Sequence, residues 1–164
     1  MDIIDDLLEH NRAFAGRLEH VHLDIRPARR LAVVTCMDAR FDAFAALGLR
    51  QGEAHVLRNA GGVITDDVIR SLAISQRRLG TEEIMLIHHT DCGLETITDD
   101  GFRAELQEAT GMAPSFAIES YTDVDDNVRQ SIARVRTSPF LLHRDRVRGF
   151  VYDVDTGLLR EVTG

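Results

Sequence analysis

Two short stretches of this sequence carry side chains that bind metal ions. Cys36-Met37-Asp38-Ala39-Arg40 follows an apolar run at 31–34, and His89-Thr90-Asp91-Cys92 follows another at 84–87. Two thiols and one imidazole suit Zn²⁺, with a fourth position left over. The two ligands of the second stretch are close enough to reach one ion from a single turn. Taken alone, that pair fits a buried structural cysteine and a packed histidine equally well.

Asp38 and Arg40 add chemistry to the first stretch. A carboxylate two residues from Cys36 can occupy the fourth zinc position, or it can turn to a guanidinium and leave that position to water. Zinc lowers the pKa of bound water to about 7, which makes a nucleophile available at neutral pH. The alternative is an ordinary surface pair of Asp38 and Arg40. The neighbouring metal-ligand cysteine favours the site.

Composition and charge limit the classes of partner and indicate the cellular compartment. A formal net charge of −8 over 164 residues argues against nucleic acid or an anionic membrane as partner, because both need a basic surface. The N-terminus is acidic where a signal peptide is basic, and no apolar run approaches the roughly 18 residues of a membrane span. We therefore expect a cytoplasmic protein, in which Cys36 and Cys92 stay reduced; a disulfide between them is the alternative.

Apolar runs alternate with amphipathic stretches along the chain. Helical spacing predicts helices over 3–19, 41–49, 66–79, 102–110 and 124–137, and apolar or alternating runs predict strands over 31–35, 54–57, 84–87, 147–154 and 158–162. This alternation predicts one α/β domain over 1–164 with a mostly parallel sheet, in which ligands bind at the carboxyl ends of strands. Residues 20–30 form a connector after the N-terminal helix. The paired Gly61 and Gly62 indicate a tight turn.

Three stretches of the chain, in order and with matching separations, resemble the signature stretches of the β-class carbonic anhydrases. They are Cys36-Met37-Asp38-Ala39-Arg40, Arg58-Asn59-Ala60-Gly61-Gly62 and His88-His89-Thr90-Asp91-Cys92-Gly93. The resemblance runs from about residue 31 to the closing segment at 147–162, and the short length is similar to that of compact bacterial members.

The resemblance implies a zinc enzyme that hydrates CO₂ to bicarbonate and a proton by zinc-bound hydroxide. It implies Cys36, His89 and Cys92 as zinc ligands and Asp38–Arg40 as a catalytic dyad. Asp38 would also ligate zinc in a closed form and pair with Arg40 in an open one. It further implies four parallel strands plus an antiparallel fifth, and a homodimer or tetramer of dimers with residues 1–30 packed on the partner. Backbone N–H groups near Gly61 and Gly62 are candidates for substrate binding.

Other functions compete with CO₂ hydration. The same motifs serve hydrolysis of carbonyl sulfide or carbon disulfide, since the access channel separates these substrates. A non-catalytic zinc protein is a second alternative, against which the intact Asp38–Arg40 pair argues. A nucleotide-binding protein is a weak third, because Asn59-Ala60-Gly61-Gly62 matches neither phosphate-binding glycine pattern. Two further residues stay open: His88 is expected to pack on the opposite side of its strand from His89, and Asp91 either supports a ligand or caps the next segment.

Overall fold

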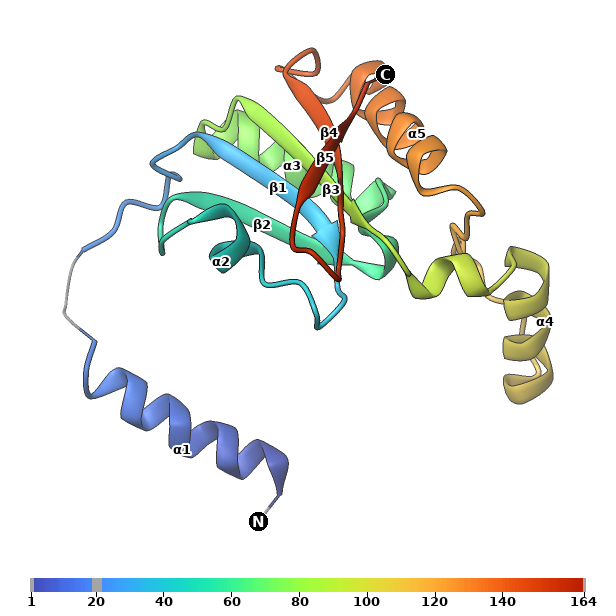
Figure 1. Ribbon diagram of the computed structural model, residues 1–164, viewed down its shortest axis with the longest axis horizontal. Coiled ribbons are helices and arrows are strands. Elements are labelled where there is room, and N and C mark those ends of the chain that lie inside the picture. The colour runs from blue at the N-terminus through green and yellow to red at the C-terminus, as the bar shows by residue number, and fades with distance from the viewer. Residues whose placement is uncertain (1, 19–21, 164) are drawn as a thin grey trace.

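A computed structural model describes residues 2–18 and 22–163, and its centre is a five-stranded sheet (Figure 1). The spatial order of the strands is β2-β1-β3-β4-β5. The first four are parallel and β5 runs antiparallel to β4, as the resemblance implies. The strands are β1 (Leu31–Cys36), β2 (Ala54–Asn59), β3 (Glu83–His89), β4 (Val147–Tyr152) and β5 (Leu159–Val162). The predicted fold class, a mostly parallel sheet flanked by helices, is confirmed.

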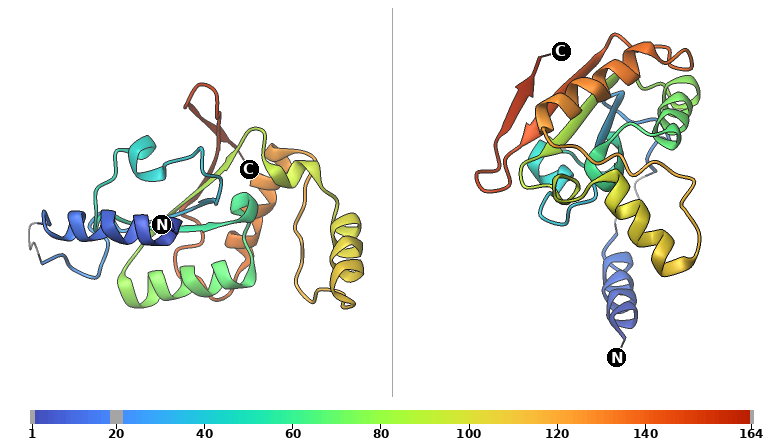
Figure 2. Two further views of the ribbon diagram at one scale, coloured as in Figure 1. Left: turned by 90° about the horizontal axis from the view of Figure 1, so that it is seen from below. Right: turned by 90° about the vertical axis from the view of Figure 1, so that its right-hand side faces the viewer.

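Helices cover both faces of this sheet, which explains why its central strands are continuously apolar. On one face, α3 (Asp66–Leu79) and α5 (Val124–Thr137) pack against β1 and β3. On the other face, Phe41 and the short α2 (Ala43–Leu47) pack against the same strands. Figure 2, left, shows α2 and α3 on opposite sides of the sheet. The carboxyl ends of β1 and β3 are therefore fixed from both sides.

Local capping sets the helix boundaries. The Thr65 side chain accepts a hydrogen bond from the Val68 backbone N–H, and Gly80 ends α3 in the left-handed conformation, so that the helix has the predicted bounds of 66–79. Helix α4 (Asp99–Thr110) begins three residues before the predicted 102, because Thr98 caps it ahead of Gly101 in its first turn. A short 3₁₀ turn, η1 (Ala60–Gly62), follows β2. A second, η2 (Gly93–Thr96), precedes α4.

Helix α1 (Ile3–Ala15) extends away from the sheet and buries none of its residues (Figure 1; Figure 2, right). It ends earlier than the predicted 3–19, of which residue 19 lies outside the described residues, as do residues 20 and 21 of the connector. Its apolar side chains, with that of the following Leu18, are more than two-fifths exposed: Ile3, Ile4, Leu7, Leu8, Phe14 and Leu18. The apolar side of this amphipathic helix is therefore exposed to solvent in the single chain.

Among the described residues, no helix is both long and apolar enough to cross a membrane.

Candidate metal centre

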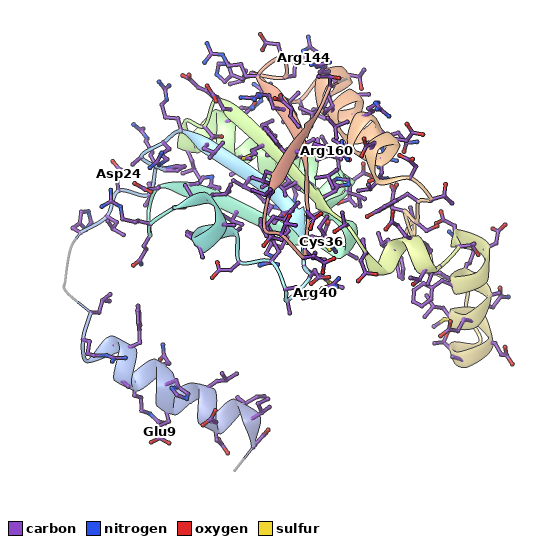
Figure 3. All side chains as sticks on the ribbon, in the orientation of Figure 1. Glu9, Asp24, Cys36, Arg40, Arg144 and Arg160 are labelled. Carbon is purple, nitrogen blue, oxygen red and sulfur yellow. The ribbon has the colours of Figure 1, made fainter. Side chains whose placement is uncertain are left out.

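Parallel pairing of β1 with β3 brings the predicted ligands together. The strands pair in register from Leu31 with Glu83 to Thr35 with Ile87, so Cys36 and His89 leave the sheet at the same edge. Cys92 follows at the start of η2. The three ligand atoms all lie within 4.8 Å of one another, and all three residues are buried. Figure 3 shows Cys36 at this end of the sheet with Arg40 beside it.

The His89 ring has the tautomer that metal ligation needs. Its Nδ1 lies 2.8 Å from the Thr90 carbonyl oxygen, which can only accept, so Nδ1 carries the proton. Its Nε2 is therefore a lone-pair donor, and it is buried without a hydrogen-bond partner among the described residues. Although burial lowers the pKa of His89, the Cys92 sulfur and the Thr90 carbonyl raise it by more. A buried lone pair facing two thiols fits a metal ion.

The two thiols have opposite acidities. The neighbouring Cys92 thiol lowers the pKa of Cys36 to about 6, and the interaction with Cys36 raises the pKa of Cys92 to about 12. Backbone groups of Asp38 and Gly61 further stabilise the Cys36 thiolate, and that of Leu94 does so for Cys92. A divalent cation between the two sulfurs would allow both to be thiolates. The donor set therefore fits Zn²⁺.

Arg40 holds the Asp38 carboxylate at the edge of this group. The Arg40 backbone N–H and Nε donate to Asp38 Oδ1 at 2.8 and 3.0 Å, and Arg40 Nη2 donates to Oδ2 at 2.8 Å. These bonds hold the pKa of Asp38 well below its usual range and raise that of Arg40. Asp38 Oδ2 lies 3.7 Å from His89 Nε2. The predicted pair thus exists beside the three ligand atoms, and the carboxylate is directed to Arg40.

Asp91 resolves one question that the sequence leaves open. Its carboxylate accepts from Arg40 Nη1 at 2.7 Å and its carbonyl accepts from Arg40 Nη2 at 2.9 Å. Its backbone has φ +55°, a left-handed conformation that turns both groups to the guanidinium. Asp91 therefore neither supports a ligand directly nor caps a helix; it fixes Arg40. The sequence does contain a signal for this pair. An acidic residue lies between the two ligands of the second stretch, and an arginine lies in the first stretch.

Arg58 has a role that the sequence did not reveal. It projects from β2, and its Nε donates to the Cys36 carbonyl at 2.9 Å while Nη2 donates to the Asp38 carbonyl at 2.6 Å. Both bonds go to backbone, so the side chain fixes the path of the chain from the ligand to the carboxylate. No spacing rule predicts contacts of this kind, because their acceptors are present at every residue.

Gly61 and Gly62 let η1 approach β1 closely. Both have positive φ, +80° and +68°. A Cβ on Gly62 would lie 2.8 Å from the Cys36 nitrogen, and one on Gly61 would clash with Leu94. The predicted tight turn is confirmed, with a steric reason for both glycines; their part in substrate binding stays a prediction.

His88 packs in the interior, as strand alternation predicts. It is fully buried, with its ring 6.1 Å from that of Tyr121, and burial lowers its pKa to about 4. It is therefore neutral at physiological pH. Tyr121, which the sequence did not single out, packs in one cluster with Cys36 and Cys92.

The fold and the site define a class: an α/β protein with a Cys₂His metal group and a carboxylate–guanidinium pair at the carboxyl ends of parallel strands. Residues 31–112 match a family model described as carbonic anhydrase. Beta-carbonic anhydrase 1 of Mycobacterium tuberculosis is 52% identical over 163 residues, 99% of each chain. The crystal structure of a carbonic anhydrase from Streptococcus mutans superposes with a TM-score of 0.93 at 43% identity, covering 99% of each chain.

The chain belongs to the β-carbonic anhydrase family. Members of this family use zinc, and Cys36, His89 and Cys92 form a possible site for it. A carbon disulfide hydrolase of Acidithiobacillus thiooxidans is 38% identical over an alignment of 152 residues that covers 80% of this chain and 76% of that protein. The family relationship supports carbonic anhydrase activity.

Replacing Cys92 by serine tests the ligand set. A serine hydroxyl stays protonated at neutral pH, so Cys92→Ser should weaken zinc binding by more than about 100-fold. This loss of affinity is larger than the loss expected when only a hydrogen bond to a ligand is removed. Chelator competition with metal analysis measures this. Asp91→Asn is the matched control. Asp91 lies between the two ligands in the sequence, but its side chain binds Arg40 and not a ligand. A full zinc equivalent in Cys92→Ser at wild-type affinity would remove Cys92 from the ligand set.

Proposed function

We propose that this protein catalyses the reversible hydration of CO₂ to bicarbonate and a proton, with zinc held by Cys36, His89 and Cys92 and with Asp38 and Arg40 as the catalytic dyad. One observation carries the proposal: a carboxylate kept ionised by Arg40 lies 3.7 Å from the free Nε2 of His89, beside two buried thiols. A purely structural metal site has no use for such a carboxylate.

Zinc held by Cys36, His89 and Cys92 would lower the pKa of water to about 7 and so would supply a nucleophile at neutral pH. The chain's own residues then orient the reaction. Asp38 stays ionised, so it can accept a hydrogen bond from the attacking oxygen and aim its lone pair at CO₂. Arg40, fixed in turn by Asp91, keeps the carboxylate in that place.

We further propose that the dyad gates the fourth zinc position. Asp38 is held by Arg40 through three short hydrogen bonds, which supports the arrangement that leaves this position to water. The distance of 3.7 Å between Asp38 Oδ2 and His89 Nε2 is short enough for a side-chain rotation to carry the carboxylate into the metal group. Asp38 is thus the proposed fourth ligand of a closed form. The N–H groups near Gly61 and Gly62 remain the proposed contacts to substrate.

Carbon disulfide or carbonyl sulfide hydrolysis is the second candidate, supported by the 38% identical carbon disulfide hydrolase. The higher identity and coverage of the mycobacterial β-carbonic anhydrase favour CO₂. A non-catalytic zinc protein is the third, and the anchored Asp38 argues against it. A cytoplasmic location stays a prediction that agrees with two ligand thiols, which must remain reduced.

We propose a homo-oligomer, at least a dimer, in which α1 packs on a second copy of the chain. The support is the row of exposed apolar side chains on a helix that contacts none of its own core. Burying such side chains against a partner is favourable at about 25 cal/mol per Å².

The function is tested by stopped-flow CO₂ hydration between about pH 6.5 and 9 on protein of known zinc content, because zinc lowers the pKa of water into this range. Carbonyl sulfide and carbon disulfide hydrolysis are run on the same preparation. Hydration that rises with pH at one zinc per chain supports the proposal. Negligible hydration by zinc-loaded protein would refute it, and the sulfur substrates would then separate the hydrolase from the non-catalytic protein.

Arg40→Ala should keep zinc and lose hydration activity by on the order of 100-fold, because Asp38 loses the group that orients it. Arg70→Ala is the control, since Arg70 is an exposed arginine that pairs with Asp67 on α3. Stopped-flow rates and zinc content are measured on both. Wild-type rates in Arg40→Ala would exclude the dyad from the mechanism.

Leu7→Asp should shift the protein toward monomers, because it places a charge within the apolar side of α1. Ala13→Asp introduces the same charge on the opposite side of the helix and should leave the assembly intact. Sedimentation velocity at several concentrations gives both masses. An oligomer that persists unchanged in Leu7→Asp would show that α1 is not the contact.

A further inference from the structure

Tyr121 brings a buried hydroxyl into the metal centre from a segment outside the three motifs. Its ring packs in one cluster with Cys36 and Cys92, together with Val63 and Leu94. The residue is only 9% exposed. Its hydroxyl oxygen is buried and has no hydrogen-bond partner within the described part of the chain.

The chain on either side of Tyr121 is anchored. Ser120 donates to Asp99 Oδ1 through its backbone N–H at 2.8 Å and through its hydroxyl. Asp123 caps α5 by accepting from the Asp126 backbone N–H at 2.8 Å. Because the chain is held on both sides of it, Tyr121 has a defined place in the cluster that contains both cysteines.

A buried hydroxyl without a partner destabilises a fold, so native proteins nearly always pair such groups. The cluster that contains Tyr121 offers two side-chain acceptors, the sulfurs of Cys36 and Cys92. The Tyr121 hydroxyl acts to lower the pKa of Cys92, and the pKa of Tyr121 is raised by burial first and then by this sulfur. A thiol sulfur accepts hydrogen bonds weakly, whereas a thiolate accepts them strongly.

We infer that Tyr121 is a positioning residue of the metal centre, whose hydroxyl donates a hydrogen bond to the thiolate of Cys92 when that thiolate binds zinc. This inference rests on the zinc site proposed above and extends it by a fourth segment. Such a bond fixes the direction of the sulfur lone pairs. It also withdraws charge from one zinc–sulfur bond, which leaves the metal a stronger Lewis acid.

The test compares Tyr121→Phe with Tyr152→Phe, which removes the same hydroxyl from the only other tyrosine of the chain. Tyr152 packs on Phe41, with ring centroids 4.4 Å apart, in a different cluster from the thiols. Since the hydroxyl of Tyr121 has no partner to lose in the thiol form, Tyr121→Phe should fold, and its thermal stability without metal should equal or exceed that of the wild type.

In Tyr121→Phe, the zinc dissociation constant from chelator competition should rise by about 10- to 100-fold. The stability gained on adding zinc should shrink accordingly. With Co²⁺ in place of zinc, the sulfur-to-cobalt charge-transfer band should move to lower energy, because the sulfur electrons lose a stabilising proton donor. Tyr152→Phe should match the wild type in all three measurements.

A charge-transfer band and zinc affinity in Tyr121→Phe equal to those of the wild type would overturn the inference. So would an equal loss of stability with and without metal, because a purely structural residue acts on both forms alike. If the wild type binds zinc and hydrates CO₂ while Tyr121→Phe matches it, only this inference fails. If the wild type binds no zinc, the proposed function fails with it.

Discussion

The metal centre depends on the pairing of β1 with β3. In a strand, neighbouring side chains point to opposite faces, so a slip of one residue would turn a ligand away from its partners. The Thr35 hydroxyl donates to the Ile87 carbonyl at 2.8 Å, within the last pair of the ladder before Cys36. Thr35 is fully buried, and this bond satisfies its hydroxyl. The contact adds to the β1–β3 ladder at the point where the two chains leave the sheet with the candidate ligands.

The charged residues beside the metal centre act by orientation more than by stability. Arg40 is about half exposed, and ion pairs in water contribute little to folding. The two acids that bind Arg40 determine the orientation of its guanidinium group. Asp91 fixes the guanidinium from one side, which leaves its other donors directed at Asp38. Arg58 fixes the backbone of Asp38 through a hydrogen bond to its carbonyl. The carboxylate is thus positioned through its side chain and its main chain independently.

The sequence predicts those parts of this structure that are local or periodic. The strands, the parallel sheet and the grouping of Cys36, His89 and Cys92 follow from apolar runs, their ends and the chemistry of three side chains. The pairing of Asp91 with Arg40, the backbone contacts of Arg58 and the approach of Tyr121 do not. Each depends on a contact between segments 20 or more residues apart. For Asp91 and Arg40 the residue types offer a signal, an acid between two ligands and an arginine in the first stretch, whereas nothing in residue spacing marks the contacts of Arg58 or Tyr121.

The groups of the proposed chemistry all come from one chain, while the exposed apolar side of α1 lies away from them. This separation divides the functions of the molecule. The motifs supply the candidate ligands and the Asp38–Arg40 pair, and a relative 38% identical to this chain is named a carbon disulfide hydrolase. We expect substrate choice to depend on segments outside the motifs, because these segments shape the approach to the candidate centre.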